Sequence, residues 1–518
     1  MTSQYHDTSI LSRRRLLYLL GAGTAAAATA ACTNTSTGTG SGVSATPSEL
    51  VLPSAATKLP TGTVKLTWMD SGDAKAAFAQ ALAAAYHKKH PNITINYDTS
   101  AWTAIDQVLS AGFRNGSAPD IFQLPATIPL QTAINNGWVG AFDDVVPHFD
   151  TVKKRFPPGA LVDGINIFNG KTYMMPMTGL ARLGNLLLFN QDYTKQAGLD
   201  LNNEVISWDQ LRSYLKKLTK QGNGEYYGLI YGTDISGAVS DMANMAGVRS
   251  GLVNTTLGGI DWKTGEFSSF TNPLAEHIVE LILAIASDGS IHPDSVSLDV
   301  TSARARFPLG QAAIMFQGPW NIPIWKQTNP GFHLGLNLPA QHDPSDIYPV
   351  SSPPGGSNSW LYNSRTKYGP VIGDIFHFWA SPDGQTQWAE YDPAGDPPFD
   401  TAAAKHATMD ALSRKALSLG ERYTAIRPEP SVRNPDVEQV DLAFVPPTQG
   451  FPQLLQGLLS KQIDKSVKQV LAQAKSDAEK ALDAAITKAR SKGAKVSRED
   501  FVFSDWNPRT PYLKLYEK

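Results

Sequence analysis

The sequence predicts an α/β fold from two stretches, residues 64–97 and residues 312–316. Residues 64–68 alternate apolar and polar side chains as a strand does, residues 74–89 carry apolar side chains at helical spacing, and residues 93–97 form a second strand. Two parallel strands joined by a helix indicate an α/β sheet. A separate apolar run at residues 312–316 is typical of a strand that is covered on both faces.

Candidate binding residues follow the ends of the first two predicted strands. Asp70 and Asp73 come after the first strand, and Trp102 comes after the second. Open α/β sheets bind their ligands at the carboxyl ends of the strands, so these three side chains are candidates for a binding site. The two carboxylates could instead cap the helix that begins near residue 74, and one side chain can serve both purposes.

A tryptophan follows the apolar strand at residues 312–316. Gly318 and Pro319 break the strand and place Trp320 just past its end. This is again the position at which an α/β sheet binds a ligand. The alternative is that Trp320 is an ordinary core residue.

The first 62 residues predict export and a tether. Residues 1–32 contain Arg13-Arg14-Arg15 and an Ala-rich apolar run that ends at Cys32, and they resemble a twin-arginine signal with a lipoprotein processing box. The run is too short to predict a membrane span. Residues 33–62, which begin with a stretch of only Thr, Asn, Ser and Gly, are interpreted as a flexible linker. We therefore expect an extracytoplasmic protein anchored to the outer face of the membrane by a lipid on Cys32; a cleaved signal with an incidental cysteine is the alternative.

Composition excludes several classes of function. Cys32 is the only cysteine in 518 residues, so the body has no disulfide, no thiol nucleophile and no cysteine metal site. The net charge of −2, without a basic cluster on a predicted face, argues against nucleic-acid binding. The sequence contains no serine elbow, zinc motif or cofactor fingerprint, so we expect no enzyme activity, no metal and no cofactor. The 11 tryptophans and 17 tyrosines suit a carbohydrate ligand, and they suit a large core equally well.

Five segments resemble, in order, motifs of the extracellular solute-binding proteins of ABC importers, in the branch related to maltose-binding protein. These segments are residues 116–122 (GSAPDIF), 168–176 (FNGKTYMMP), 186–190 (LLLFN), 208–211 (WDQL) and 310–320 (GQAAIMFQGPW). Phe189 replaces a tyrosine of the family pattern and Ser207 replaces a threonine, which are mild departures. In the last segment the family places its tryptophan, here Trp320, against a sugar ring.

The resemblance implies a two-lobed periplasmic-binding-protein-like fold of class II, in which each lobe is discontinuous in sequence. It implies a first lobe formed by residues 63–177 and 353–398, and a second formed by residues 178–352 and 399–489. Residues 490–518 extend past the usual end of the family and have no assigned role.

The resemblance also implies a cleft between the lobes that binds the solute. Besides the four residues named above, the candidates for this cleft are Gln123, Thr127, Arg182, Asp234, Ser236, Gly355 and Gly356. Arg182 could equally be an interlobe salt-bridge residue, and the two glycines could simply form a hinge turn.

The implied function is solute capture for an ABC importer. We expect a monomer that binds a sugar or oligosaccharide by hinge closure and delivers it to the transmembrane subunits of the permease. Two alternatives stay open from the sequence: a ligand-sensing lipoprotein without a transport role, and a secreted glycoside-active enzyme that uses a pair of carboxylates.

Overall fold

The computed structural model describes residues 49–102, 104–125, 127–249, 252, 258–356, 358–391 and 394–516. The expected signal sequence, Cys32 and the linker up to residue 48 lie outside the described residues. Within the described ranges, no helix reaches the length and hydrophobicity that crossing a membrane would require.

The first lobe is built on a four-stranded sheet with the order β11-β3-β1-β2. Its strands are β1 (Val64–Asp70), β2 (Ile93–Thr99), β3 (Ile121–Gln123) and β11 (Trp360–Tyr362). The first three strands are parallel, and β11 pairs with β3 in the antiparallel direction. The predicted strand–helix–strand unit is therefore confirmed, and the fourth strand returns from far along the chain.

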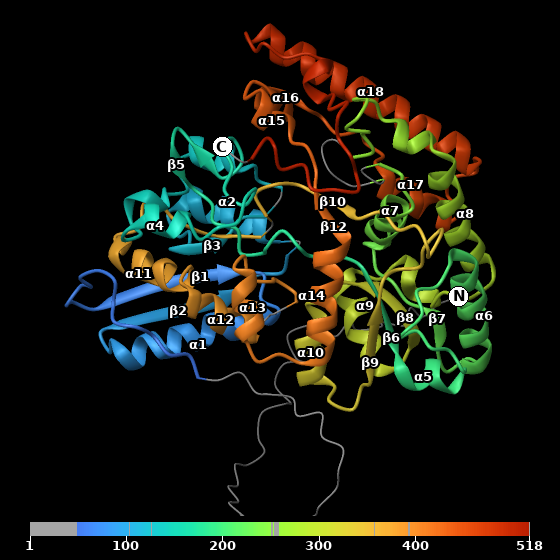
Figure 1. Cartoon of the computed structure of the whole chain (residues 1–518), viewed down its shortest axis with the longest axis horizontal. Helices are drawn as coiled ribbons and strands as arrows, with labels where there is room; N and C mark the ends of the chain where they lie inside the picture. Colours follow the sequence, from blue (N-terminus) through green and yellow to red (C-terminus); the bar gives the residue numbers. More distant parts are fainter. Residues whose placement is uncertain are drawn as a thin grey trace, which may run out of the picture. The chain divides into compact units, whose positions relative to one another are not determined.

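Helices cover both faces of this sheet (Figure 1). On one face α1 (Ala74–Lys89), α11 (Gly369–Trp379) and α12 (Pro382–Tyr391) pack against the inward side chains of β1, including Leu66 and Trp68. On the other face α2 (Ile105–Asn115) packs against Met69 and Phe122. Neighbouring residues of one strand thus enter different apolar clusters, as the period of two in a strand requires.

The second lobe is built on a four-stranded sheet with the order β7-β8-β6-β9. Its strands are β6 (Leu186–Asn190), β7 (Tyr227–Leu229), β8 (Ala312–Gln317) and β9 (Leu334–Asn337). Strand β8 is parallel to β7 and antiparallel to β6, which is also antiparallel to β9. Every residue of β8 is buried, as the uninterrupted apolar run predicted.

The helices of the second lobe begin where the sequence provides caps. Helix α6 (Trp208–Gly222) starts with a capping box between Ser207 and Gln210, and α8 (Pro273–Ser287) starts at Asn272 with proline in its first turn. The remaining α-helices of the described residues, in both lobes, are α3 (Leu130–Asn135), α4 (Phe149–Lys153), α5 (Gln191–Gln196), α7 (Ile235–Met245), α9 (Val300–Arg306), α10 (Asn321–Thr328), α13 (Thr401–His406), α14 (Ala411–Tyr423), α15 (Pro430–Arg433), α16 (Val437–Ala443), α17 (Phe451–Leu459) and α18 (Val467–Ser491).

Two small strand pairs complete the fold. Strands β4 (Ile167–Phe168) and β5 (Lys171–Thr172) form a hairpin, with positive φ at Asn169 and Gly170 in the turn. Strands β10 (Val350–Ser352) and β12 (Thr424–Ile426) pair in parallel beside the segments that connect the two sheets. The lobe boundaries suggested by the sequence stay a proposal.

The described part of the expected linker, residues 49–62, packs against the first lobe. Leu50 is buried in the core there, the Val51 amide donates to Gln387 Oε1 (2.8 Å), and the Ala56 amide donates to Asp374 Oδ1 (2.6 Å). The Ser/Thr/Gly run that predicts flexibility ends before residue 43. Residues 49–62 contain leucine and valine, and they bury part of this apolar surface.

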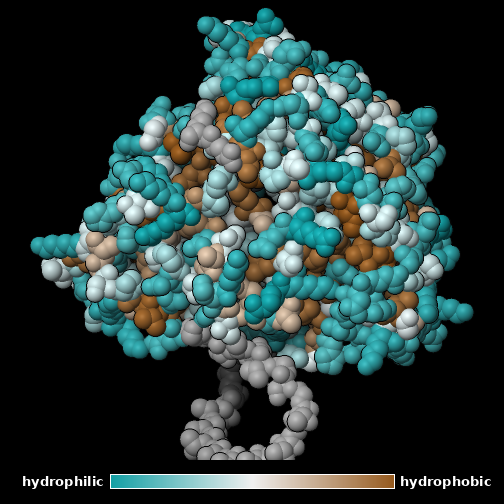
Figure 2. Space-filling model, viewed as in Figure 1, coloured by the Kyte–Doolittle hydropathy of each residue, from teal (hydrophilic) through white to brown (hydrophobic). Residues whose placement is uncertain are grey.

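The C-terminal extension also belongs to the folded body. Phe501, Phe503, Trp506 and Tyr512 are buried in the core of the second lobe. The Tyr512 amide donates to the Ile426 carbonyl (2.9 Å), which places the extension alongside β12. On the face shown in Figure 2, the surface is largely hydrophilic, and apolar residues gather in separate patches.

Candidate functional site

Two sheet edges carry the residues that the sequence singled out. Because Trp360 is paired with Gln123, β11 begins at the edge where β1, β2 and β3 end. Because Leu186 is paired with Gln317, β6 begins at the edge where β8 ends. We call the carboxyl ends of β1, β2 and β3, with the start of β11, the first-lobe edge. We call the carboxyl ends of β7 and β8, with the start of β6, the second-lobe edge.

An ion pair joins the two edges. Asp73 Oδ1, just before α1 on the first-lobe edge, lies 3.0 Å from Arg304 Nη2 on α9 of the second lobe. Arg304 is held by a 2.6 Å hydrogen bond from its Nε to Oδ1 of the buried Asn321. Within the described part of the chain Asp73 makes no side-chain capping bond to α1, so the structure does not support the capping alternative, and its side chain pairs with Arg304 instead.

Asp70 and Gln123 lie inside the first-lobe edge. Asp70 has no exposed surface, and its carboxylate accepts from the Gly72 amide (2.7 Å), the Tyr97 hydroxyl and Trp360 Nε1 (2.9 Å). Burial raises the pKa of Asp70. Gln123 accepts from the Ser71 amide (3.0 Å) and donates to Asn358 Oδ1 (3.4 Å). In this structure both side chains hold the backbone and side chains around the ends of β1 and β3.

Trp102 and Thr127 are the exposed candidates of the first-lobe edge. The Trp102 side chain is 48% exposed in the turn after β2, and Thr127 is exposed in the loop after β3. A large ring left half in water at the carboxyl end of a sheet offers an apolar face to a ligand.

Trp320 lies at the second-lobe edge with Arg182 beside it. The indole is partly exposed and folds back over Gly318, where an added Cβ would lie 2.1 Å from the ring. Arg182 Cζ lies 5.5 Å from the Trp320 ring centroid. The same guanidinium forms a salt bridge with Asp396 (3.1 Å), as the salt-bridge alternative for Arg182 expects. Its position beside Trp320 is also compatible with a role in the cleft.

Carboxylates follow β7 on the second-lobe edge. Asp234 accepts a 2.7 Å hydrogen bond from Gln317 Nε2, and burial raises its pKa. Two helical turns further along α7, Asp241 accepts a 2.8 Å hydrogen bond from Asn185 Nδ2, and burial raises its pKa to about 6. Ser236 lies between them in the sequence and is buried. Such carboxylate and amide groups suit the hydroxyls of a polar solute.

Gly355 and Gly356 are explained by contacts within the protein. Both have positive φ, at 84° and 69°. An added Cβ would lie 2.5 Å from Ile165 at the first position and 2.5 Å from Pro176 at the second. These contacts favour the hinge-turn alternative, because the glycines allow two chain segments to touch.

Four of the residues above escaped the sequence analysis: Asn185, Asp241, Arg304 and Asn321. Gln317 escaped it as well, but it could have been found, since it directly follows the strand predicted at residues 312–316. The other four carry no local signal, because their roles come from partners far away in the chain.

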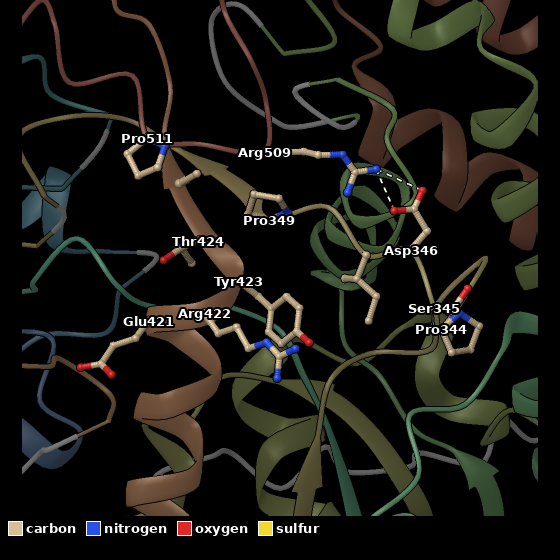
Figure 3. A pocket seen from close by; sticks show the side chains of 12 residues that line it. Pro344, Ser345, Asp346, Pro349, Glu421, Arg422, Tyr423, Thr424, Arg509 and Pro511 are labelled. Atoms are coloured by element: carbon tan, nitrogen blue, oxygen red, sulfur yellow. Dashed lines mark hydrogen bonds and ion pairs between the residues drawn. The ribbon is translucent and has the colours of Figure 1, made fainter.

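A cavity of about 450 Å³ is lined by a different set of residues (Figure 3). Its walls are the loop at residues 344–349, the end of α14 with the start of β12, and Arg509 and Pro511 of the C-terminal extension. Arg509 closes one side through its pair with Asp346, at 2.8 and 3.0 Å. Among the residues lining this cavity there is none of the sequence-predicted candidates.

The fold resembles several solved structures. A substrate-binding protein from Listeria monocytogenes in complex with cycloalternan superimposes with a TM-score of 0.57 and 15% identity, covering 81% of this chain and 99% of that one. The GacH receptor of Streptomyces glaucescens, solved unliganded and with acarbose, gives a TM-score of 0.58 at 18% identity and covers 81% and 99%. A Thermotoga lettingae solute-binding protein bound to α-D-tagatose gives 0.59 at 16% identity and covers 82% and 100%. These likenesses confirm the two-lobed periplasmic-binding-protein-like fold.

Comparisons of sequence agree with the fold. A binding protein of Brucella abortus (strain 2308) is 24% identical over 276 residues, which are 53% of this chain. The match spans 62% of the length of that relative. The family model described as "Bacterial extracellular solute-binding protein" matches residues 70–386, more than half of the chain. The protein therefore belongs to the bacterial extracellular solute-binding protein family, as its motifs predicted.

Proposed function

We propose that the protein is the solute-binding component of an ABC importer and that it captures a sugar or oligosaccharide between the first-lobe and second-lobe edges. The observation that carries the proposal is the placement of one accessible tryptophan at each edge, Trp102 and Trp320. Aromatic rings cover the apolar faces of sugar rings, and the amide and carboxylate groups nearby serve the hydroxyls.

Capture proceeds by hinge closure. A solute that touches both edges binds the closed arrangement more tightly than the open one, and this difference in affinity shifts the population toward closure. The Asp73–Arg304 ion pair joins the two edges, and this modest electrostatic contact adds to the interactions that hold the lobes together. The chemistry requires no catalytic group.

The proposed location is the outer face of the cell membrane. A lipid on Cys32 anchors the protein there, and the chain after it leads to residue 49, from which the segment packs on the first lobe. From this position the closed, loaded protein delivers its solute to the transmembrane subunits of a permease. Solved neighbours bind cycloalternan, acarbose and tagatose, which supports carbohydrate as the solute class.

The test is calorimetric titration of the exported protein carrying Cys32→Ser. The panel holds neutral mono- and oligosaccharides, polyols, amino acids and polyamines, each at several concentrations. We expect saturable heat with a carbohydrate or polyol, lost or weakened in Trp320→Ala. Saturable binding of amino acids or polyamines alone would contradict the carbohydrate assignment.

A further inference from the structure

Three chain segments connect the two lobes, and their backbones touch. We call their described residues crossover one (177–185), crossover two (353–356 and 358–359) and crossover three (394–400). The Gly179 amide donates to the Pro397 carbonyl (2.7 Å), which joins crossovers one and three. The Met177 amide donates to the Asn358 carbonyl (3.0 Å), which joins crossovers one and two.

The crossovers lie too close together for side chains at two of their glycines. A Cβ at Gly179 would lie 2.8 Å from the Pro398 carbonyl oxygen. A Cβ at Gly356 would lie 2.8 Å from the Thr178 carbonyl oxygen. Real Cβ atoms do not approach backbone oxygens this closely, so any change in interlobe angle must move the three segments in a coordinated way.

One buried carboxylate binds all three crossovers. Asp396, on crossover three, is 4% exposed, and its Oδ1 accepts from the Thr178 hydroxyl, from Asn358 Nδ2 (2.7 Å) and from Arg182 Nη1 (3.1 Å). Thr178 and Arg182 lie on crossover one, and Asn358 lies on crossover two. The backbone of Asp396 is itself held, because its carbonyl accepts from Nε1 of the buried Trp388 (2.8 Å).

Contacts extend from Asp396 to both edges. Toward the first-lobe edge, Asn358 Oδ1 accepts from Gln123, which in turn accepts from the Ser71 amide. Toward the second-lobe edge, Arg182 carries its guanidinium to Trp320. Two side chains, Asn358 and Gln123, thus link Asp396 to the loop after β1, and one side chain, Arg182, links it to the Trp320 indole.

The charge of Asp396 is needed for this arrangement. Burial alone would raise its pKa, but the nearby charges of Arg182 and Lys75 and the hydrogen bonds from Thr178 and Asn358 hold its pKa below the usual value. A buried ion loses its hydration and depends on partners of opposite charge. Without the carboxylate, Arg182 would lose its ion-pair partner and keep its hydrogen bond to the Gly395 carbonyl (3.1 Å), and two crossovers would lose their shared acceptor.

We propose that Asp396 is a positioning residue of the binding site, which sets the interlobe angle of the ligand-free protein and holds Arg182 against Trp320. The proposal rests on the proposed function in one respect, that the cleft between the two edges is where the solute binds. The action of Asp396 on the lobes requires no solute, so it can be measured separately.

The test measures the distance between the lobes by pulsed electron spin resonance. The chain has a single cysteine, so Cys32→Ser gives a background without thiols, and nitroxides are attached to Arg114→Cys on α2 and Lys217→Cys on α6, both exposed positions. We expect Asp396→Asn, without any ligand, to broaden the distance distribution or to shift it by several ångströms.

Asp374→Asn is the matched control. Asp374 is 7% exposed and accepts from the Tyr86 hydroxyl and the Ala56 amide, so it is equally buried but lies in the first-lobe core. We expect this variant to lower the melting temperature while the distance distribution stays that of the parent. If Asp396→Asn and Asp374→Asn give the same distribution, Asp396 is an ordinary buried carboxylate and the proposal is wrong.

Two milder variants decide the question if Asp396→Asn fails to fold. Thr178→Val and Asn358→Ala each remove one crossover's donor to Asp396 and keep the Arg182 ion pair. Broadening in either supports the proposal, and parental distributions in both overturn it. Titration of the parent with the panel of mono- and oligosaccharides and polyols then separates the two hypotheses: absence of binding across these probes counts against the proposed carbohydrate function and leaves the distance result unaffected.

Discussion

The guanidinium carbon of Arg182 lies 5.5 Å from the ring centroid of Trp320, although 138 residues separate them in the chain. The indole packs over Gly318, so the glycine and the arginine together determine its orientation. A cation near an aromatic face contributes about 0.5–1 kcal/mol at an exposed site. The sequence predicts only that Trp320 follows a strand, whereas the contact with Arg182 fixes the orientation of its ring.

Replacing Trp320 with alanine should weaken carbohydrate binding by about 1–3 kcal/mol, the loss expected from aromatic contact and buried area. The ring is partly exposed, so the variant should stay folded. Titration calorimetry measures the affinity and circular dichroism checks the fold. Unchanged affinity would assign Trp320 a structural role alone.

Gly318→Ala tests the orientation of the same ring. The added Cβ would lie 2.1 Å from the indole, so the ring must turn away from its present position. We expect a loss of affinity comparable with that of Trp320→Ala, measured in the same titration. Gly331→Ala, at a position where a Cβ meets no neighbouring atom within 4 Å, is the control and should bind as the parent does.

The stability of the protein should depend on pH through Asp241. Its folded pKa is raised to about 6 by burial, so between the unfolded value and pH 6 the folded state binds more protons than the unfolded state. The unfavourable contribution of this carboxylate therefore develops as pH rises through that window and is complete above it. Asp241→Asn should be more stable than the parent at pH 8, with the difference vanishing near pH 4, as measured by urea unfolding.

Asp288 supplies the opposite sign in the same experiment. Hydrogen bonds from Arg212 lower its pKa, so its contribution to stability is present at neutral pH and is lost as pH falls through the folded pKa. Asp288→Asn should therefore be less stable than the parent at pH 8. If the stability differences of both variants from the parent change with pH in the same direction, the raised pKa of Asp241 is wrong.

Removal of residues 494–518 should destabilise the second lobe strongly. The truncation deletes Phe501, Phe503 and Trp506 from the buried core, and loss of one buried aromatic side chain typically costs about 3–5 kcal/mol. Urea unfolding of the truncated protein measures the effect. A midpoint equal to that of the full chain would show that the extension is dispensable for folding.

Cys32→Ser should release the exported protein from the membrane fraction, because one lipid-modified residue is the proposed anchor. Fractionation followed by immunodetection measures the distribution. Retention of the variant in the membrane fraction would contradict a lipid anchor on Cys32.

Much of the local structure could be predicted from the sequence. The strand–helix–strand unit at residues 64–97, the cap at Ser207, the hairpin at Gly170 and the buried strand before Trp320 all follow from side-chain periodicity, capping residues and glycine conformations. Part of the expected linker packed against the body, because the Ser/Thr/Gly composition that argued for flexibility ends before Leu50.

By itself, the sequence determined the family, the α/β lobes and the edge positions of Asp70, Asp73, Trp102, Gln123 and Trp320, since these depend on residues close together in the chain. Only the tertiary structure decided which of these side chains are accessible. It buried Asp70 and Gln123 among their own donors and paired Asp73 with Arg304, 231 positions away. It also brought Thr178, Asn358 and Arg182 to Asp396. The physical reason is that a polar side chain satisfies its hydrogen bonds with whatever the fold places beside it, and local sequence carries no record of that neighbour.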